Sequence, residues 1–156
     1  MDKHVRISML DRSDRKAIHE IAGWYLTEWQ IPEATTIERL TNQSKDDIVS
    51  HFVASVDGRN VASGGLHKKV GILKVYPGMG KFGPWVAVLY TIPRYRKQGI
   101  GEQLMARIEE AAREAGFKKI YLYTYTAESL YRKCGWKEIE RVQYKGHSCA
   151  LMAKSV

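Results

Sequence analysis

Cysteine is scarce in this sequence, and the cysteines present lack the spacing of metal ligands. Cys134 and Cys149 form no CxxC pair, so the sequence indicates neither a disulfide framework nor a zinc module. We expect two reduced thiols in a cytoplasmic protein, and no bound metal. The alternative is a nucleophilic Cys134 beside Arg132 and Lys133, but the sequence places no histidine as its base.

Long hydrophobic runs are missing as well. No apolar run approaches the roughly 18 residues that a transmembrane helix needs. The first four residues carry charges where a secretion signal needs an apolar core. We therefore expect no association with a membrane. The chain of 156 residues has no internal repeat and no linker, so we predict a single domain over residues 1–156.

Acidic residues are too few to balance the basic ones. The chain has 17 Asp and Glu against 25 Lys and Arg, a formal net charge of +8, which suits an anionic partner such as nucleic acid or a polyphosphate. The densest basic stretch, Arg94–Lys97, lies beside a glycine-rich turn. This placement favours a phosphate-bearing ligand. Because no predicted helix carries a clustered basic face, we expect no nucleic-acid partner.

The spacing of apolar residues predicts an α/β domain on a mixed sheet. Alternating or continuous apolar runs predict strands at 3–10, 48–56, 61–67, 85–92, 117–125, 136–144 and 147–154. Helical periodicity predicts helices from an N-cap at Ser13 to Trp29, at 35–43, from Gly99 to Ala115 and at 127–134.

The turn after the strand at 85–92 carries the most specific pattern. That strand is apolar on both faces, as a central strand would be, and Arg96-x-x-Gly99-x-Gly101 opens the next helix. A helix start presents unpaired N–H groups and the positive end of the helix dipole, which bind phosphate. Glycines let the oxygens approach the backbone. The pattern predicts a pyrophosphate cradle, although a plain tight turn has similar residues.

Residues 89–101 (LYTIPRYRKQGIG) resemble the strand–turn–helix pattern of the GNAT superfamily of acyl-CoA N-acyltransferases. A second match, from Tyr121–Thr124 to Leu130–Trp136, is similar to the family's next strand and its Y-x-x-x-G-[FW] helix. The resemblance implies a mostly antiparallel GNAT-like sheet. It also implies transfer of acetyl from acetyl-CoA to a primary amine, of a small molecule or a peptide, by direct attack in a ternary complex. Family members are often homodimers, so the resemblance also implies a homodimer.

The resemblance further implies how the cofactor is held. Backbone groups of the central strand would pair with the pantetheine arm, amides at the helix start would hold the pyrophosphate, and the thioester would lie between the central strand and the next. The implied cofactor-binding residues are Leu89, Tyr90, Thr91, Arg96, Lys97, Gln98, Gly99, Ile100, Gly101 and Glu102. Many members have a cofactor-contacting Asn where this chain has Thr124, so Thr126 or Ser129 replaces that contact or it is absent.

Acetyl transfer needs a proton for the leaving thiolate and a donor for the developing oxyanion. By resemblance the general acid is Tyr131, whose phenol is protonated at neutral pH. The alternative role for Tyr131 is packing. We expect the oxyanion donor to be a strand N–H near Tyr90 or Thr91. The candidates for the base are Glu28 and His67, either of which could instead be a surface residue.

Two expectations concern the acceptor side. Segment 69–83, rich in glycine and proline, is predicted to be a mobile loop that borders the acceptor site. Some aromatic side chains could line an acceptor pocket or simply fill the core: Trp24, Tyr25, Trp29, Tyr76 and Trp85. The rival to catalysis is a non-catalytic acyl-CoA-binding or regulatory module with the same cradle.

Overall fold

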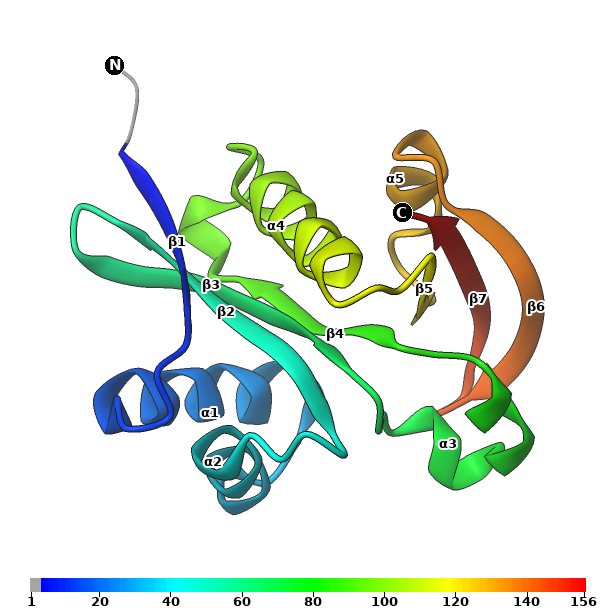
Figure 1. The fold of residues 1–156 in the computed structure, drawn as a ribbon, viewed down its shortest axis with the longest axis horizontal. Helices are drawn as coiled ribbons and strands as arrows, with labels where there is room; N and C mark the ends of the chain where they lie inside the picture. The colour runs from blue at the N-terminus through cyan, green and yellow to red at the C-terminus, as the bar shows by residue number, and fades with distance from the viewer. Residues whose placement is uncertain (1–3) are drawn as a thin grey trace.

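The computed structural model describes residues 4–156, which form one mixed sheet with helices on both faces (Figure 1). Lys3, where the first predicted strand begins, lies outside the described residues. The elements in chain order are β1 (Val5–Met9), α1 (Arg15–Trp29), α2 (Glu33–Asn42), β2 (Ile48–Val56), β3 (Arg59–His67), α3 (Ile72–Val75), the 3₁₀ helix η1 (Pro77–Lys81), β4 (Trp85–Thr91), the 3₁₀ helix η2 (Pro93–Tyr95), α4 (Ile100–Glu114), β5 (Lys119–Thr124), α5 (Glu128–Lys133), β6 (Lys137–Tyr144) and β7 (His147–Ser155).

The sheet has seven strands in the order β1-β2-β3-β4-β5-β7-β6. Neighbouring strands are antiparallel except β4 and β5, which run parallel. A parallel pair needs a crossover connection, and α4 provides it. The predicted single α/β domain with a mixed, mostly antiparallel sheet is therefore confirmed.

The alternation of side chains along the strands divides the core between the two faces of the sheet. Helices α4 and α5 lie on one face, and α1, α2 and α3 lie on the other (Figure 1). The buried residues of the α4 face include Phe52, Leu66, Ile100, Leu104 and Ile108. Those beneath α1 and α2 include Ile18, Ile21, Tyr25, Leu40 and Val53.

The predicted N-cap of the first helix is wrong by one residue. The carboxylate of Asp14 accepts the N–H of Ala17 at 3.1 Å and caps α1. Ser13 instead donates its N–H and its hydroxyl to Asp11, at 2.8 and 2.7 Å. A carboxylate caps as well as a hydroxyl, so adjacent Ser and Asp leave the first residue of the helix ambiguous in sequence.

The prediction of a loop over 69–83 is also wrong, because this segment contains α3 and η1. Ile72 and Met79 are buried against Trp85. The hydroxyl of Tyr76 donates to the carbonyl of Gln143 at 2.5 Å, which joins η1 to the β6–β7 hairpin. These buried apolar side chains and this hydrogen bond order the segment despite the glycines between them.

Candidate active site

β4 and β5 separate as soon as they have met. Within the described residues their register contains one pair, Trp85 with Tyr121, supported by a hydrogen bond of 3.0 Å from the N–H of Tyr121 to the carbonyl of Pro84. Beyond this pair, no strand among residues 4–156 pairs with the β5 side of β4. We call this region the β4–β5 split.

Alternation of the backbone indicates which groups of β4 face the split. The N–H of Ile92 donates to Val61 of β3 at 2.9 Å. Successive residues of a strand direct their N–H groups to opposite sides, so the N–H of Thr91 is directed away from β3 and toward the split. The backbone of Tyr90 pairs with Ser63 on the β3 side.

A β-bulge interrupts β4 next to the split. Gly65 pairs with Ala87 and Ser63 with Tyr90, so Val88 and Leu89 together oppose the single residue Gly64. Val88 has a φ of 48°, in the left-handed region. A bulge leaves a residue outside the ladder and reorients its backbone groups, so amides of this stretch of β4 are available to a ligand.

The start of α4 lies at the end of the same strand. Gly99 is the N-cap with a φ of 82°, and no side chain caps the helix. The N–H of Gln103 makes the first helical hydrogen bond, to the carbonyl of Gly99 at 3.0 Å, so the amides of Ile100, Gly101 and Glu102 have no helical partner. A Cβ on Gly101 would meet no described atom closer than 3.9 Å. Packing within the protein therefore does not explain this glycine, whereas close approach of a ligand does.

The basic residues before α4 are placed differently from one another. The guanidinium of Arg96 lies over the ring of Tyr90, 5.3 Å from its centroid, and its Nε donates to the carbonyl of Thr91 at 2.8 Å. Arg96 is thus folded back onto the end of β4. Lys97 is exposed, with a φ of 62°, and the side-chain amide of Gln98 donates to Arg94 at 3.2 Å.

Tyr131 lies on α5 and is half-buried against the core cluster beneath α4, as is Leu89 of the bulge. Its ring meets Trp136 edge to face, with centroids 6.2 Å apart. Burial, and secondarily the neighbouring Cys134, raises the pKa of Tyr131 above its ordinary value. The phenol therefore stays protonated at neutral pH and can donate a proton or a hydrogen bond.

Thr124, at the position of the family's Asn, has a local structural role. Its hydroxyl accepts the N–H groups of Thr126 and Ala127, at 3.3 and 3.2 Å, and so orders the turn into α5. Thr126 and Ser129 are exposed.

His67 is not at the surface, in contrast to the surface position considered from the sequence. It is only 1% exposed, as is His51, and both belong to a chain of hydrogen bonds that we call the histidine network. Its members are Asp47, Arg39, His67, His51 and Ser63.

The direction of every hydrogen bond in the histidine network follows from Arg39. The guanidinium can only donate, so Nδ1 of His67 accepts from it at 3.0 Å. Nε2 of His67 then carries the hydrogen and donates to Nδ1 of His51 at 2.9 Å. Nε2 of His51 donates to Ser63, also at 2.9 Å, and Ser63 donates to the carbonyl of Phe52.

The network keeps both imidazoles neutral. Burial, followed by the nearby Arg39, lowers the pKa of His51 to about 3. Burial, His51 and Arg39 together lower the pKa of His67 well below its ordinary value. With both ring nitrogens engaged and protonation disfavoured, the geometry weighs against His67 as a general base. Glu28, the other candidate, is exposed near the end of α1.

The aromatic residues considered for the acceptor side fall into two groups. Trp24 and Trp29 are half-buried around Tyr90, with ring centroids 6.0 and 5.9 Å from it. Trp85 and Tyr76 belong instead to the cluster beneath α3. The first group therefore lies on the α1 side of β4, near the bulge, and the second near the base of the split.

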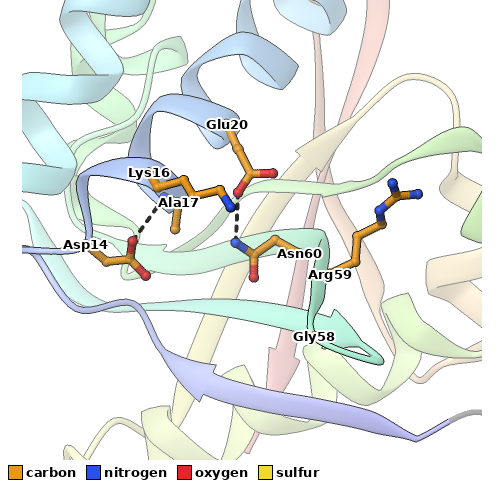
Figure 2. A pocket seen from close by; sticks show the side chains of 7 residues that line it. All are labelled: Asp14, Lys16, Ala17, Glu20, Gly58, Arg59 and Asn60. Carbon is orange, nitrogen blue, oxygen red and sulfur yellow. Dashed lines mark hydrogen bonds between the residues drawn. The ribbon is translucent and has the colours of Figure 1, made fainter.

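A small cavity of about 20 Å³ lies between α2 and the histidine network, and Val88 of the bulge also lines it. A larger one, of about 350 Å³, lies between the start of α1 and the β2–β3 turn (Figure 2). There Glu20 accepts from Asn60 at 3.0 Å, and Asp14 caps α1. This larger cavity lies on the β2–β3 side of the molecule, away from the split.

Sequence reasoning missed the bulge and the histidine network. The adjacent glycines Gly64 and Gly65 were the available signal, because glycine inside a strand often marks a bulge or a close approach. A Cβ on Gly64 would lie 2.7 Å from Leu89, and one on Gly65 would lie 2.5 Å from His51. Gly64 thus makes room for Leu89 of the bulge, and Gly65 makes room for His51 of the histidine network on the other face of the sheet.

Among residues 4–156, no group of three or more His, Cys, Asp and Glu side chains is placed to hold a metal ion. Nor does this part of the chain include a helix with the length and hydrophobicity needed to cross a bilayer.

Solved structures share the fold at low identity. An aminoglycoside 6'-N-acetyltransferase complexed with coenzyme A has a TM-score of 0.75 and 17% identity, covering 96% of each chain. PaiA N-acetyltransferase from Thermoplasma acidophilum, in complex with coenzyme A, has a TM-score of 0.66 and 21% identity over 98% of this chain and 99% of that one. The ribosomal-protein-S18-alanine N-acetyltransferase from Escherichia coli has a TM-score of 0.68 and 18% identity, covering 97% and 94%.

At these identities the structures establish the fold alone. No curated protein sequence matches the chain. The model of the acetyltransferase (GNAT) family, however, matches residues 16–136, which include the bulge, the start of α4 and Tyr131. With its split sheet and uncapped α4, the chain belongs to the GNAT family of acetyltransferases.

Proposed function

We propose that this enzyme transfers acetyl from acetyl-CoA to a primary amine by direct attack within a ternary complex. The observation that carries the proposal is the β4–β5 split, which ends at an uncapped helix start. The split offers strand amides to the pantetheine arm, and the amides of Ile100, Gly101 and Glu102 offer donors to the pyrophosphate. One linear ligand with a diphosphate and an amide-bearing arm fits both the strand amides of the split and the amides at the helix start.

The backbone supplies most of the proposed cofactor site. Leu89 and Thr91 lie two residues apart, so both direct main-chain groups to the split. Tyr90 contributes its ring on the α1 face, where Arg96 covers it. The sequence led us to expect the oxyanion donor near Tyr90 or Thr91. We now assign it instead to an amide of the bulge at Val88 and Leu89, because the groups of the bulge have left the ladder with β3.

Tyr131 is proposed as the general acid to the leaving thiolate. Its raised pKa makes it a weak acid, and a free thiol has a pKa of about 8.5. A hydrogen bond to the developing thiolate, with partial proton transfer, is thus the chemistry that the phenol supports. The attacking amine must lose a proton too, and the exposed Glu28 remains a candidate base.

The acceptor is proposed to be the amine of a small molecule or a peptide. Both kinds occur among the similar structures, one named for aminoglycosides and another for the S18 alanine of a ribosomal protein. Trp24 and Trp29 beside Tyr90 support an acceptor path on the α1 side of β4. We also propose that the chain forms a single catalytic domain, since one sheet joins strands from Val5 to Ser155.

The test combines binding and turnover. Calorimetry should detect coenzyme A binding to the purified protein, and an amine panel should release free thiol from acetyl-CoA. Replacing Tyr131 by Phe should lower kcat by roughly ten- to a thousand-fold, the usual contribution of general acid catalysis. Tyr125→Phe is the matched control, since Tyr125 is exposed and stacks on His147.

The outcomes separate the possibilities. If coenzyme A binds but no amine releases thiol, the chain is a non-catalytic acyl-CoA-binding module. If turnover survives Tyr131→Phe with acetyl-CoA still bound, the assignment of Tyr131 fails and transfer proceeds without this acid.

A further inference from the structure

Helix α5 carries Tyr131 but is weakly anchored. It has six residues, none of them fully buried, and no side chain caps its start at Ala127. Tyr131 and Cys134 pack against the core, but only in part. A group that must meet a reacting sulfur needs its position fixed to within about 0.5 Å, so something besides core packing has to hold this helix.

Two charged side chains connect the first turn of α5 to the edge strand β6. Nη1 and Nη2 of Arg141 donate to the two carboxylate oxygens of Glu128, at 3.0 and 2.7 Å. This two-point contact fixes orientation as well as distance, because the planar guanidinium matches the carboxylate. We call Glu128 and Arg141 the α5 clamp.

Arg141 is itself held by β6 and β7. Nη2 donates to Glu138 at 2.6 Å, and Nη1 donates to the hydroxyl of Ser148 at 3.1 Å. Arg132 of α5 also reaches Glu138, at 2.9 Å. The guanidinium of Arg141 thus joins the helix to two strands, and its hydrogen bonds are the main cause that lowers the pKa of Glu128.

The clamp residue Glu128 lies three positions before Tyr131. Residues three apart lie on the same side of a helix, one turn apart, so fixing Glu128 fixes the turn from which the phenol projects. Arg141 and Glu128 are exposed or half-exposed. As a solvent-exposed ion pair, the clamp is expected to contribute little to global stability. Its two-point geometry is instead suited to fixing the orientation of α5.

We propose that Arg141 and Glu128 are positioning residues for acetyl transfer, which hold α5 so that the hydroxyl of Tyr131 meets the thiol sulfur. The proposal rests on the proposed role of Tyr131. The clamp does not touch the α4 cradle, so it should affect turnover and leave cofactor binding alone.

The experiment is a double-mutant cycle on kcat in the full-length enzyme. Arg141→Gln should lower kcat by roughly ten- to a hundred-fold, the usual effect of misplacing a catalytic group by about 1 Å. The KM for acetyl-CoA should stay within about two-fold, because α4 is unchanged. In the Tyr131→Phe background the same change should have almost no further effect, since the group that it positions is already lost.

Two further variants serve as controls for the cycle. Arg141→Lys, which keeps the charge but loses the two-point contact, should recover part of the lost turnover and no more. Arg113→Gln removes an exposed arginine in the last turn of α4 and should leave kcat unchanged.

Each result decides one point. If Arg141→Gln leaves kcat unchanged, or lowers it as much in the Tyr131→Phe background as in the wild type, the clamp proposal is overturned. If Tyr131→Phe alone has no effect on kcat, the role of Tyr131 fails and the clamp proposal fails with it. A loss of kcat that vanishes in the Tyr131→Phe background supports both.

Discussion

Two polar networks in this molecule join elements that are distant in sequence. One is buried in the protein, and the other is exposed at its surface. The histidine network links α2 to β2 and β3 inside the protein, with both imidazoles almost without solvent contact. The clamp links α5 to β6 at the surface. Burial makes the first network sensitive to protons and intolerant of added volume. Exposure makes the second sensitive to salt and nearly irrelevant to stability.

Acidification should have the largest effect on the buried network. The unfolded chain binds protons on its histidines below pH about 6.5, while His51 and His67 in the folded chain do not, because their pKa values are lowered. The free energy of unfolding therefore reaches its highest value, as far as these histidines determine it, above pH 6.5, and it decreases as the pH drops below that. His51 should contribute a loss of about 2 kcal/mol between pH 6.5 and 5, and His67 should add a loss of the same sign.

Urea denaturation at a series of pH values measures this loss. His51→Gln should remove the contribution of His51 to it, and His19→Gln, a change at an exposed site, should leave it intact. An unaltered pH dependence in the His51 variant would show that the acid sensitivity arises elsewhere.

Gly65→Ala should have the next largest effect. The new Cβ would lie 2.5 Å from both Nδ1 of His51 and the carbonyl oxygen of Ser50. The backbone atom cannot yield cheaply, so we expect a destabilisation of about 3 kcal/mol from overpacking and disturbed hydrogen bonds. Thermal or urea unfolding measures it. Gly78→Ala, with no atom near its Cβ, is the control, and equal effects of the two changes would contradict the packing argument.

Loss of the clamp should have the smallest effect on stability. Arg141→Gln is expected to leave the urea midpoint close to that of the wild type, because exposed ion pairs contribute little. Any remaining difference should shrink further at high salt, which screens the pair. A midpoint shift as large as that of Gly65→Ala would mean that the clamp holds the fold and not only the position of α5.

The sequence predicted what lies in contiguous segments. Apolar periodicity placed the strands and long helices, and the helix start at Gly99 was predictable because one short run of residues contains it. The histidine network was not visible, since it depends on the register that sets His51 opposite Gly65 and on Arg39 arriving from α2. The bulge at Val88 had only an indirect signal in the glycines of β3.

The clamp shows the same limit. Glu128 and Arg141 are 13 residues apart on different elements, so no helical or strand period relates them. Tyr131 was predicted as the general acid by resemblance alone, and that role stays a prediction. The sequence contained no hint of the contacts between its helix and β6. Local patterns therefore located the groups, and long-range packing decided how they are oriented.

The β4–β5 split has a consequence for how this protein can change. The donors that β4 directs into the split are main-chain N–H groups, which every residue except proline possesses. Substituting the side chain of Leu89 or Thr91 would leave those N–H groups in place, so we expect such variants to keep binding at the proposed donor site. The proposed acceptor side is instead formed by side chains, such as Trp24 and Trp29. Point substitutions there are expected to change the acceptor while the proposed donor stays the same.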